Sequence, residues 1–234
     1  MTQITNRPQN RLLASLSFTE YRRLSPKLNQ IELTFGEVLY EPGVPIKQVY
    51  FPNDSIISLL SAMSARSTIE VGMVGSEGMA GLPVFMGVDI SPTRAIVQGA
   101  GSAMRMTSSA LRSEATRLGA FHQLIHRYSN SVNSQSSQAS ACNRFHSVDS
   151  RLARWLLMTS DRLGSDEFRL TQEFMSNMLG VRREGVNRSA SALQSAKLIH
   201  YSRGVVSILN RLELQTKACE CYAIIKGESD QYLN

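Results

Sequence analysis

The stretch that decides the fold is LTQEFMSNMLGVRREGVNRSASALQSAKLIHYSRGVVSIL, residues 170–209. It predicts a first helix capped by Thr171, because a threonine side chain can accept a hydrogen bond from the first helical turn. Gly180 suits the left-handed backbone conformation that a tight turn between two helices requires. A second helix is expected from about Arg182 to Ala196, so the stretch predicts two closely joined helices.

The second helix is predicted to be amphipathic. Val186, Ala190 and Leu193 recur at helical spacing and are expected to face the core. The opposite arc then carries side chains that suit DNA, since arginine can donate two hydrogen bonds to guanine and a carboxylate can accept one from cytosine. We therefore predict base contacts from the exposed residues of this arc, which are Arg183, Glu184, Asn187 and Arg188.

The flanking segments are predicted to contact phosphates. The start of a helix suits phosphate oxygens, and such contacts position a protein on DNA without specifying sequence. After the second helix, KLIHYSRGVVSIL predicts two strands joined by a turn at Ser202–Gly204, which is a winged hairpin. The predicted phosphate contacts are Thr171, Gln172, Ser191 and Arg203. An alternative stays open, in which the arginines form an ordinary solvated helix face.

The N-terminal half has a different sequence pattern. Residues 31–107 hold short β-branched and aromatic runs that are broken by glycine and proline. This spacing of strands and turns predicts an antiparallel barrel or roll. Short helical pieces are expected from Asn10 to Leu28, and an amphipathic helix from Val148 to Leu163.

A heptad pattern follows the predicted strands. From Leu118 onward, mostly apolar positions are spaced alternately three and four residues apart, which indicates a helix with a coiled-coil seam. Because small residues in this helix would let two backbones approach closely, we predict that it pairs with its counterpart in a homodimer. The alternative is that the stripe packs on its own barrel. The predicted seam residues are Leu118, Phe121, Ile125, Tyr128, Val132, Ala139 and Cys142.

Composition narrows the class of protein. The chain has 234 residues, a net charge of +6 and a pI near 9.5, which favours polyanionic partners. No apolar run is long enough to span a membrane, and the polar start lacks a signal segment. We expect a cytoplasmic protein with no membrane partner.

Catalytic and metal sites are not expected. Residues 31–107 contain no histidine, and neither a phosphate-binding loop nor a nucleophile elbow occurs. A barrel-type metal enzyme with a passive helical tail is the disfavoured alternative. Cys219 and Cys221 could bind a metal or be oxidised, but no second pair of ligands is evident nearby, so buried structural thiols are favoured. Their role stays open.

The chain resembles transcription regulators of the Crp/Fnr superfamily over nearly its whole length. Residues 35–51, FGEVLYEPGVPIKQVYF, resemble the first strands of that family's cyclic-nucleotide-binding-type β-roll, and residues 170–199 resemble its winged helix. The family's recognition helix carries an Arg-Glu-x-x-x-Arg pattern, which Arg183, Glu184 and Arg188 match. Arg182 departs from the family, where serine or threonine usually caps the helix, and it adds a phosphate donor.

The resemblance implies an α+β fold. Its expected parts are an N-terminal antiparallel, jelly-roll-like β-roll with short helices (1–110), a long dimerisation helix (111–146), a winged helix-turn-helix domain (147–217) and a C-terminal tail (218–234). It implies a homodimeric regulator at a near-palindromic site, with double-stranded DNA, a second copy of the chain and RNA polymerase as partners.

The resemblance also points to an effector pocket, formed by Gly81, Leu82, Thr93 and Arg94. Leu82 stands where cyclic-AMP-binding relatives place a glutamate that holds the ribose hydroxyl. A leucine cannot accept that hydrogen bond, and an unpaired hydroxyl costs about 1–3 kcal/mol. We therefore expect no cyclic AMP, and either another small effector or ligand-independent regulation. Arg94 could instead pair with Asp89 or Glu77.

Overall fold

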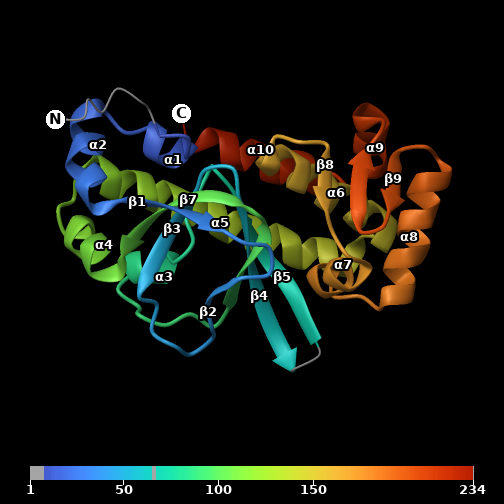
Figure 1. Cartoon of the computed structure of the whole chain (residues 1–234), viewed down its shortest axis with the longest axis horizontal. Helices are drawn as coiled ribbons and strands as arrows, with labels where there is room; N and C mark the ends of the chain where they lie inside the picture. The colour runs from blue at the N-terminus through green and yellow to red at the C-terminus, as the bar shows by residue number, and fades with distance from the viewer. Residues whose placement is uncertain (1–7, 65–66, 234) are drawn as a thin grey trace. The chain divides into compact units, whose positions relative to one another are not determined.

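The computed structural model describes residues 8–64 and 67–233. The chain divides into two compact units (Figure 1). Unit 1 comprises residues 1–59, 73–133 and 229–234, and unit 2 comprises residues 60–72 and 134–228. Two of the boundaries fall within one strand hairpin, one falls within the longest helix and one falls within the last helix.

The strands of the N-terminal half form two sheets in the described residues. One sheet has the order β1-β7-β3 and the other β2-β6-β4-β5. Strand β7 runs antiparallel to both β1 and β3, and β2 runs antiparallel to β6. The antiparallel roll predicted for residues 31–107 is confirmed. The strands are β1 (Asn29–Leu33), β2 (Val38–Tyr40), β3 (Gln48–Pro52), β4 (Ile56–Ser64), β5 (Ser67–Val74), β6 (Arg94–Gly99) and β7 (Gly101–Thr107).

Apolar residues of these strands form the core of unit 1. Leu33, Val49 and Phe51 are almost fully buried there, together with Leu12 and Leu13 from the first helix. The helices of this half are α1 (Arg11–Ala14), α2 (Phe18–Leu24), the 3-10 helix η1 (Ser25–Lys27), α3 (Leu82–Phe85), α4 (Ser108–Ala115) and α5 (Ala120–Phe145). The short helices predicted between Asn10 and Leu28 are thus confirmed.

The long helix differs from the prediction at its start. The chain leaves helical structure between α4 and α5, where Leu118 has a φ of 51° and is 70% exposed. A continuous helix from residue 111 is therefore wrong, because a positive φ at a leucine cannot be part of a right-handed helix. Leu118 lies outside α5 and cannot belong to a seam on it.

The predicted dimer seam is also wrong at its buried positions. Phe121, Ile125 and Tyr128 pack into the core of unit 1, and the Tyr128 hydroxyl donates a hydrogen bond to the Met79 carbonyl over 2.8 Å. Cys142 is fully buried against Cys219 within unit 2. Side chains that are buried inside one chain cannot contact a second copy. Of the other predicted seam residues, Val132 is half-buried against the same core as Phe121, and Ala139 is half-buried.

Helix α6 (Val148–Leu163) is the centre of unit 2 and matches its predicted bounds. Ser147 caps its start, Gly164 ends it in the left-handed conformation, and residues 151–160 are all buried. The remaining elements are α7 (Gln172–Leu179), α8 (Arg183–Ser195), α9 (Arg211–Lys217), α10 (Cys221–Gln231) and the sheet β8-β10-β9, with β8 (Glu167–Arg169), β9 (Ile199–Ser202) and β10 (Val205–Ile208).

The hairpin of β4 and β5 contributes residues 60–72 to unit 2. Trp155 on α6 donates a hydrogen bond from Nε1 to Oε1 of Glu70 over 3.0 Å. The side chain of Ile69 lies against Gly180. The hairpin therefore packs against α6 and the turn after α7.

None of the helices in residues 8–64 and 67–233 combines the length and the apolar character that crossing a membrane requires.

Candidate nucleic-acid interface

Helices α7 and α8 form the two-helix motif that the sequence predicts. The Thr171 hydroxyl accepts a hydrogen bond from the Phe174 amide over 3.1 Å and so caps α7. Gly180 follows α7 with a φ of 62°, and its amide bonds back to the Ser176 carbonyl. Gly180 therefore ends one helix in the conformation that the turn to the next requires.

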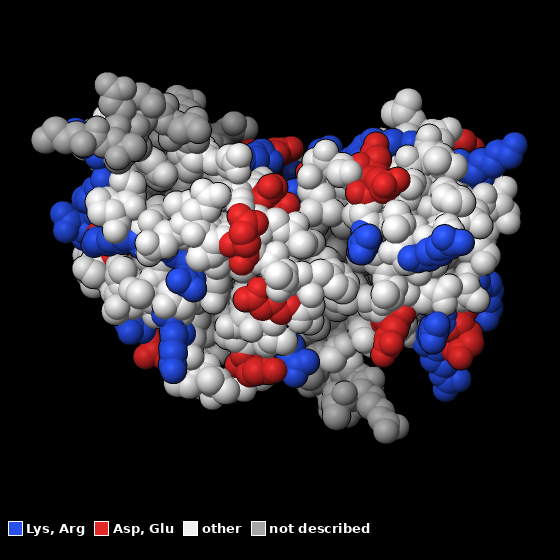
Figure 2. Space-filling model, in the orientation of Figure 1, with Lys and Arg blue, Asp and Glu red and all other residues white. Residues whose placement is uncertain are grey.

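Helix α8 places its two faces as predicted. Val186, Ala190 and Leu193 are buried, so the helix packs through them. Arg182 precedes the helix and makes no side-chain cap. In Figure 2, basic and acidic side chains lie together over the start of α8. The side chains of the opposite arc are all exposed, namely Arg183, Glu184, Asn187, Arg188 and Ser191.

Gln172 links the two helices. Its Nε2 donates a hydrogen bond to Oδ1 of Asn187 over 3.0 Å, and its Oε1 accepts one from Nε of Arg183 over 3.4 Å. The sequence predicted a phosphate contact for Gln172, and the structure gives the half-buried side chain partners on α8. The sequence alone does not indicate this pairing, because it depends on the angle between the two helices.

The predicted wing is present. Strands β9 and β10 are antiparallel, and Ser202 pairs with Val205 across a two-residue turn. Arg203 and Gly204 have φ values of 50° and 76°, the positive values that a type I′ hairpin turn requires. Arg203 is exposed at this turn. The Tyr201 hydroxyl donates to the Leu170 carbonyl over 3.2 Å and holds the wing against the start of the motif.

The four residues predicted to line an effector pocket already make contacts within unit 1. Leu82 is buried, and a Cβ on Gly81 would lie 2.7 Å from Cγ1 of Val49. The prediction that Arg94 pairs with Asp89 or Glu77 is wrong, because Arg94 Nε donates to Oε2 of Glu41 over 2.8 Å. Thr93 lies next to Arg94, and its amide donates to the Ser91 hydroxyl. Arg94 is still 41% exposed, so the ion pair leaves part of the guanidinium accessible.

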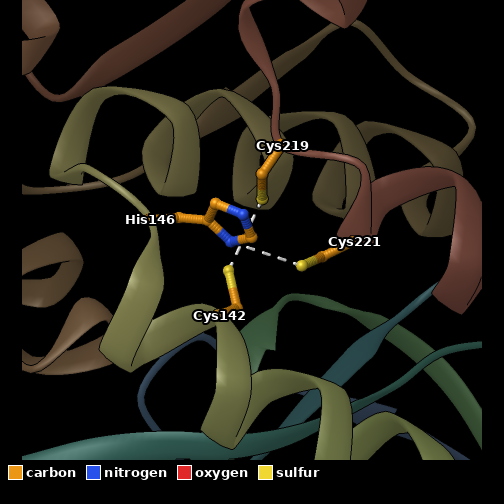
Figure 3. Close-up of side chains that lie close together, drawn as sticks. All are labelled: Cys142, His146, Cys219 and Cys221. Carbon is orange, nitrogen blue, oxygen red and sulfur yellow. Dashed lines mark hydrogen bonds between the residues drawn. The ribbon is translucent and has the colours of Figure 1, made fainter.

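A second cluster lies elsewhere in unit 2. Cys142 and His146, at the end of α5, meet Cys219 and Cys221, which lie before and at the start of α10. Figure 3 shows these four side chains pointing toward one another. A hydrogen bond from Cys219, aided by the positive charge of Arg154, holds the pKa of Cys142 below its usual range. The sequence shows no second pair of ligands close to Cys219 and Cys221, and the fold supplies one in Cys142 and His146.

Comparison with known proteins agrees with this architecture. Residues 150–217 match the family described as the Crp-like helix-turn-helix domain. No curated protein matches the chain in sequence. Many solved structures match the chain, and the three described next match across most of their own lengths at low identity, which makes the likeness one of fold.

The first is a protein from Eubacterium rectale that was assigned to the Crp/Fnr family of transcriptional regulators, at 18% identity and a TM-score of 0.65, covering 88% of this chain and 96% of that one. The second is FixK2 from Bradyrhizobium japonicum, at 15% identity and a TM-score of 0.70, covering 82% and 98%. The third is the c-di-GMP-responsive global regulator CLP from Xanthomonas campestris, at 15% identity and a TM-score of 0.65, covering 82% and 99%.

The buried and exposed faces of α8, the glycine turn and the wing agree with the family match at residues 150–217. Residues 150–217 therefore form a Crp-like helix-turn-helix domain, and the chain shares its fold with the three solved structures.

Proposed function

We propose that this protein is a homodimeric transcription regulator that reads a near-palindromic DNA site with the exposed arc of α8. The observation that carries the proposal is the division of this helix into a buried apolar face and an exposed face with Arg183, Glu184 and Arg188. A helix of this kind after a tight turn fits the major groove, with its N-terminal residues toward the base edges.

Each exposed side chain has a chemical role in this proposal. Arg183 and Arg188 donate to O6 and N7 of guanine, and Glu184 accepts from the amino group of cytosine. Asn187 contacts a base edge beside them. Thr171, Arg182, Ser191 and Arg203 contact phosphate oxygens, which fix the position of α8 along the groove.

The dimer would pair through a face of α5 other than the predicted seam. The exposed residues of α5 include a stripe with alternating steps of three and four residues, formed by Gln123, His126, Asn130, Asn133, Ser137, Ser140 and Arg144. This spacing places the stripe along one side of the helix, and its small serines would let a second α5 approach closely. A dimer would present two α8 helices to major grooves about 34 Å apart. Sedimentation equilibrium of the full chain tests this, and a monomer at micromolar concentration would contradict it.

Regulation would act through the β-roll. The buried Leu82 supports an effector other than cyclic AMP, since a leucine cannot pair with a ribose hydroxyl. Arg94 would then hold an anionic group after releasing Glu41. The second candidate is a regulator of the same fold without an effector, which the Arg94–Glu41 ion pair favours. A cytoplasmic location, contact with RNA polymerase and the absence of catalytic activity complete the proposal.

The decisive experiment compares arginine variants on a DNA site selected from a random-sequence duplex library. Arg183→Ala and Arg188→Ala should each weaken binding by about 1–3 kcal/mol, with relaxed preference at one base pair per half-site. Arg117→Ala removes an exposed arginine of unit 1 and serves as the matched control. Fluorescence anisotropy at several salt concentrations measures the affinity and the salt slope. Equal affinity and equal slope for all four proteins would reject the assignment of α8.

A further inference from the structure

We propose that Cys142, His146, Cys219 and Cys221 form a tetrahedral binding site for a single zinc ion. The proposal concerns a part of unit 2 that the DNA-binding proposal does not use.

The spacing of the four ligand atoms fits one ion. The three sulfurs and one ring nitrogen all lie within 4.8 Å of one another. A tetrahedral zinc ion with a Zn–S distance of about 2.3 Å and a Zn–N distance of about 2.0 Å holds its ligand atoms about 3.5–3.8 Å apart. The Cys142 and Cys219 sulfurs are 3.5 Å apart, and Sγ of Cys221 is 3.5 Å from Nδ1 of His146. Small adjustments of the side chains therefore complete the tetrahedron.

The ligand set is one that zinc prefers. Three thiolates and one imidazole make up a common structural zinc site, whose four protein ligands leave no open position for a substrate. The three cysteines are buried and none is in a disulfide. His146 directly follows α5, and its amide donates a hydrogen bond to the Cys142 carbonyl over 3.1 Å, so the end of the helix brings the two residues together.

The surroundings orient the imidazole as a ligand. Nε2 of His146 lies 3.1 Å from Oε1 of Glu220, while Nδ1 faces Cys221. A carboxylate on the second ring nitrogen fixes the tautomer and orientation of a metal-binding histidine and raises its basicity. Nε2 of Gln138 donates to Sγ of Cys221 over 3.1 Å, which stabilises a thiolate at that position.

The charge balance of the neighbourhood gives an independent reason. Arg151 and Arg154 on α6 are buried, and their charges act on Cys142. In residues 8–64 and 67–233 neither forms an ion pair, and the Nε of each has no hydrogen-bond partner. A buried cation is costly without a nearby negative charge. Three thiolates around a divalent ion carry one net negative charge, so the occupied site offsets part of this cost.

The full-length protein, purified without chelator, should contain about one zinc ion per chain by mass spectrometry of the metal. Cobalt added to the metal-free chain should give the ligand-field bands of a tetrahedral thiolate site and a thiolate-to-metal charge-transfer band. Cys142→Ser, His146→Ala and Cys221→Ser should each lower zinc affinity by more than 100-fold, as competition with a chromogenic chelator measures. Glu220→Ala removes a partner of a ligand and should lower it by about 10–100-fold.

The matched control is His200→Ala, which removes an exposed histidine of β9 and should leave zinc affinity unchanged. Because the metal content of the wild-type chain is itself a readout, the proposal stays testable where a variant fails to fold. Substoichiometric zinc in a chain that shows no cobalt spectrum would overturn it. So would iron with acid-labile sulfide, or a disulfide between Cys142 and Cys219. None of these readouts depends on DNA binding, so each proposal can fail alone.

Discussion

Gln172 on α7 donates a hydrogen bond from Nε2 to Oδ1 of Asn187 on α8, over 3.0 Å. The same amide accepts a hydrogen bond from Arg183. One side chain of the first helix thus restrains two of the side chains that we assign to base contacts.

Gln172→Ala should weaken binding to the selected DNA site by about 3- to 10-fold, since each hydrogen bond contributes about 0.5–1.5 kcal/mol and Asn187 and Arg183 would lose their orientation. Fluorescence anisotropy measures the change. Asn177→Ala removes an exposed amide from the same helix and should have no effect. An unchanged affinity for Gln172→Ala would mean that the interhelix bonds do not orient the reading side chains.

Gly180→Ala should destabilise the protein by about 1–3 kcal/mol. The substitution is strained at a φ of 62°, and its Cβ would lie 2.8 Å from Cδ1 of Ile69. Gly164→Ala is the matched control, because that glycine has a φ of 64° and open space around the new Cβ. Denaturant unfolding of both variants separates backbone strain from the clash. An equal loss of unfolding free energy in the two variants would show that the contact between the new Cβ and Ile69 does not destabilise the protein.

Glu114→Gln should lower the free energy of unfolding by about 1–3 kcal/mol. The Glu114 side chain is 1% exposed and forms ion pairs with Arg23 and Lys27. The loss is smaller than for a fully buried pair because both cations are partly exposed. Glu41→Gln removes the more exposed pair with Arg94 and should cost less than about 1 kcal/mol. Urea unfolding at neutral pH measures both, and the reverse order of the two losses would contradict this explanation.

Alkaline pH should destabilise unit 1 through Tyr40. Burial raises the pKa of Tyr40 above its usual value, and a hydrogen bond to the Gly81 backbone opposes this only in part. Above about pH 10 the unfolded chain loses the phenol proton while the folded chain keeps it, so stability falls by up to about 1.4 kcal/mol per pH unit.

Tyr40→Phe should flatten this part of the pH profile, measured by urea unfolding from pH 7 to pH 11. Tyr21 is less buried, and burial raises its pKa as well. Tyr21→Phe should therefore flatten the profile less. A profile for Tyr40→Phe that matches the wild type would place the alkaline sensitivity elsewhere.

Local sequence pattern was sufficient to predict the helix-turn-helix domain. Thr171, Gly180 and the apolar spacing of Val186, Ala190 and Leu193 act within one or two helical turns. These features can be predicted from the sequence because the cap, the turn and the buried stripe each depend on residues that are close together along the chain. The wing turn at Arg203 and Gly204 was predictable for the same reason.

The sequence by itself therefore determined the order of the elements, the exposed arc of α8 and the antiparallel roll. Only the tertiary structure decided what the stripe on α5 packs against, since a heptad pattern indicates that a face is buried and not which surface covers it. It also decided that Cys142 meets Cys219, 77 residues away. Ligands that are so far apart in sequence have no local signal, because only the packing of α5 against the end of unit 2 brings them together.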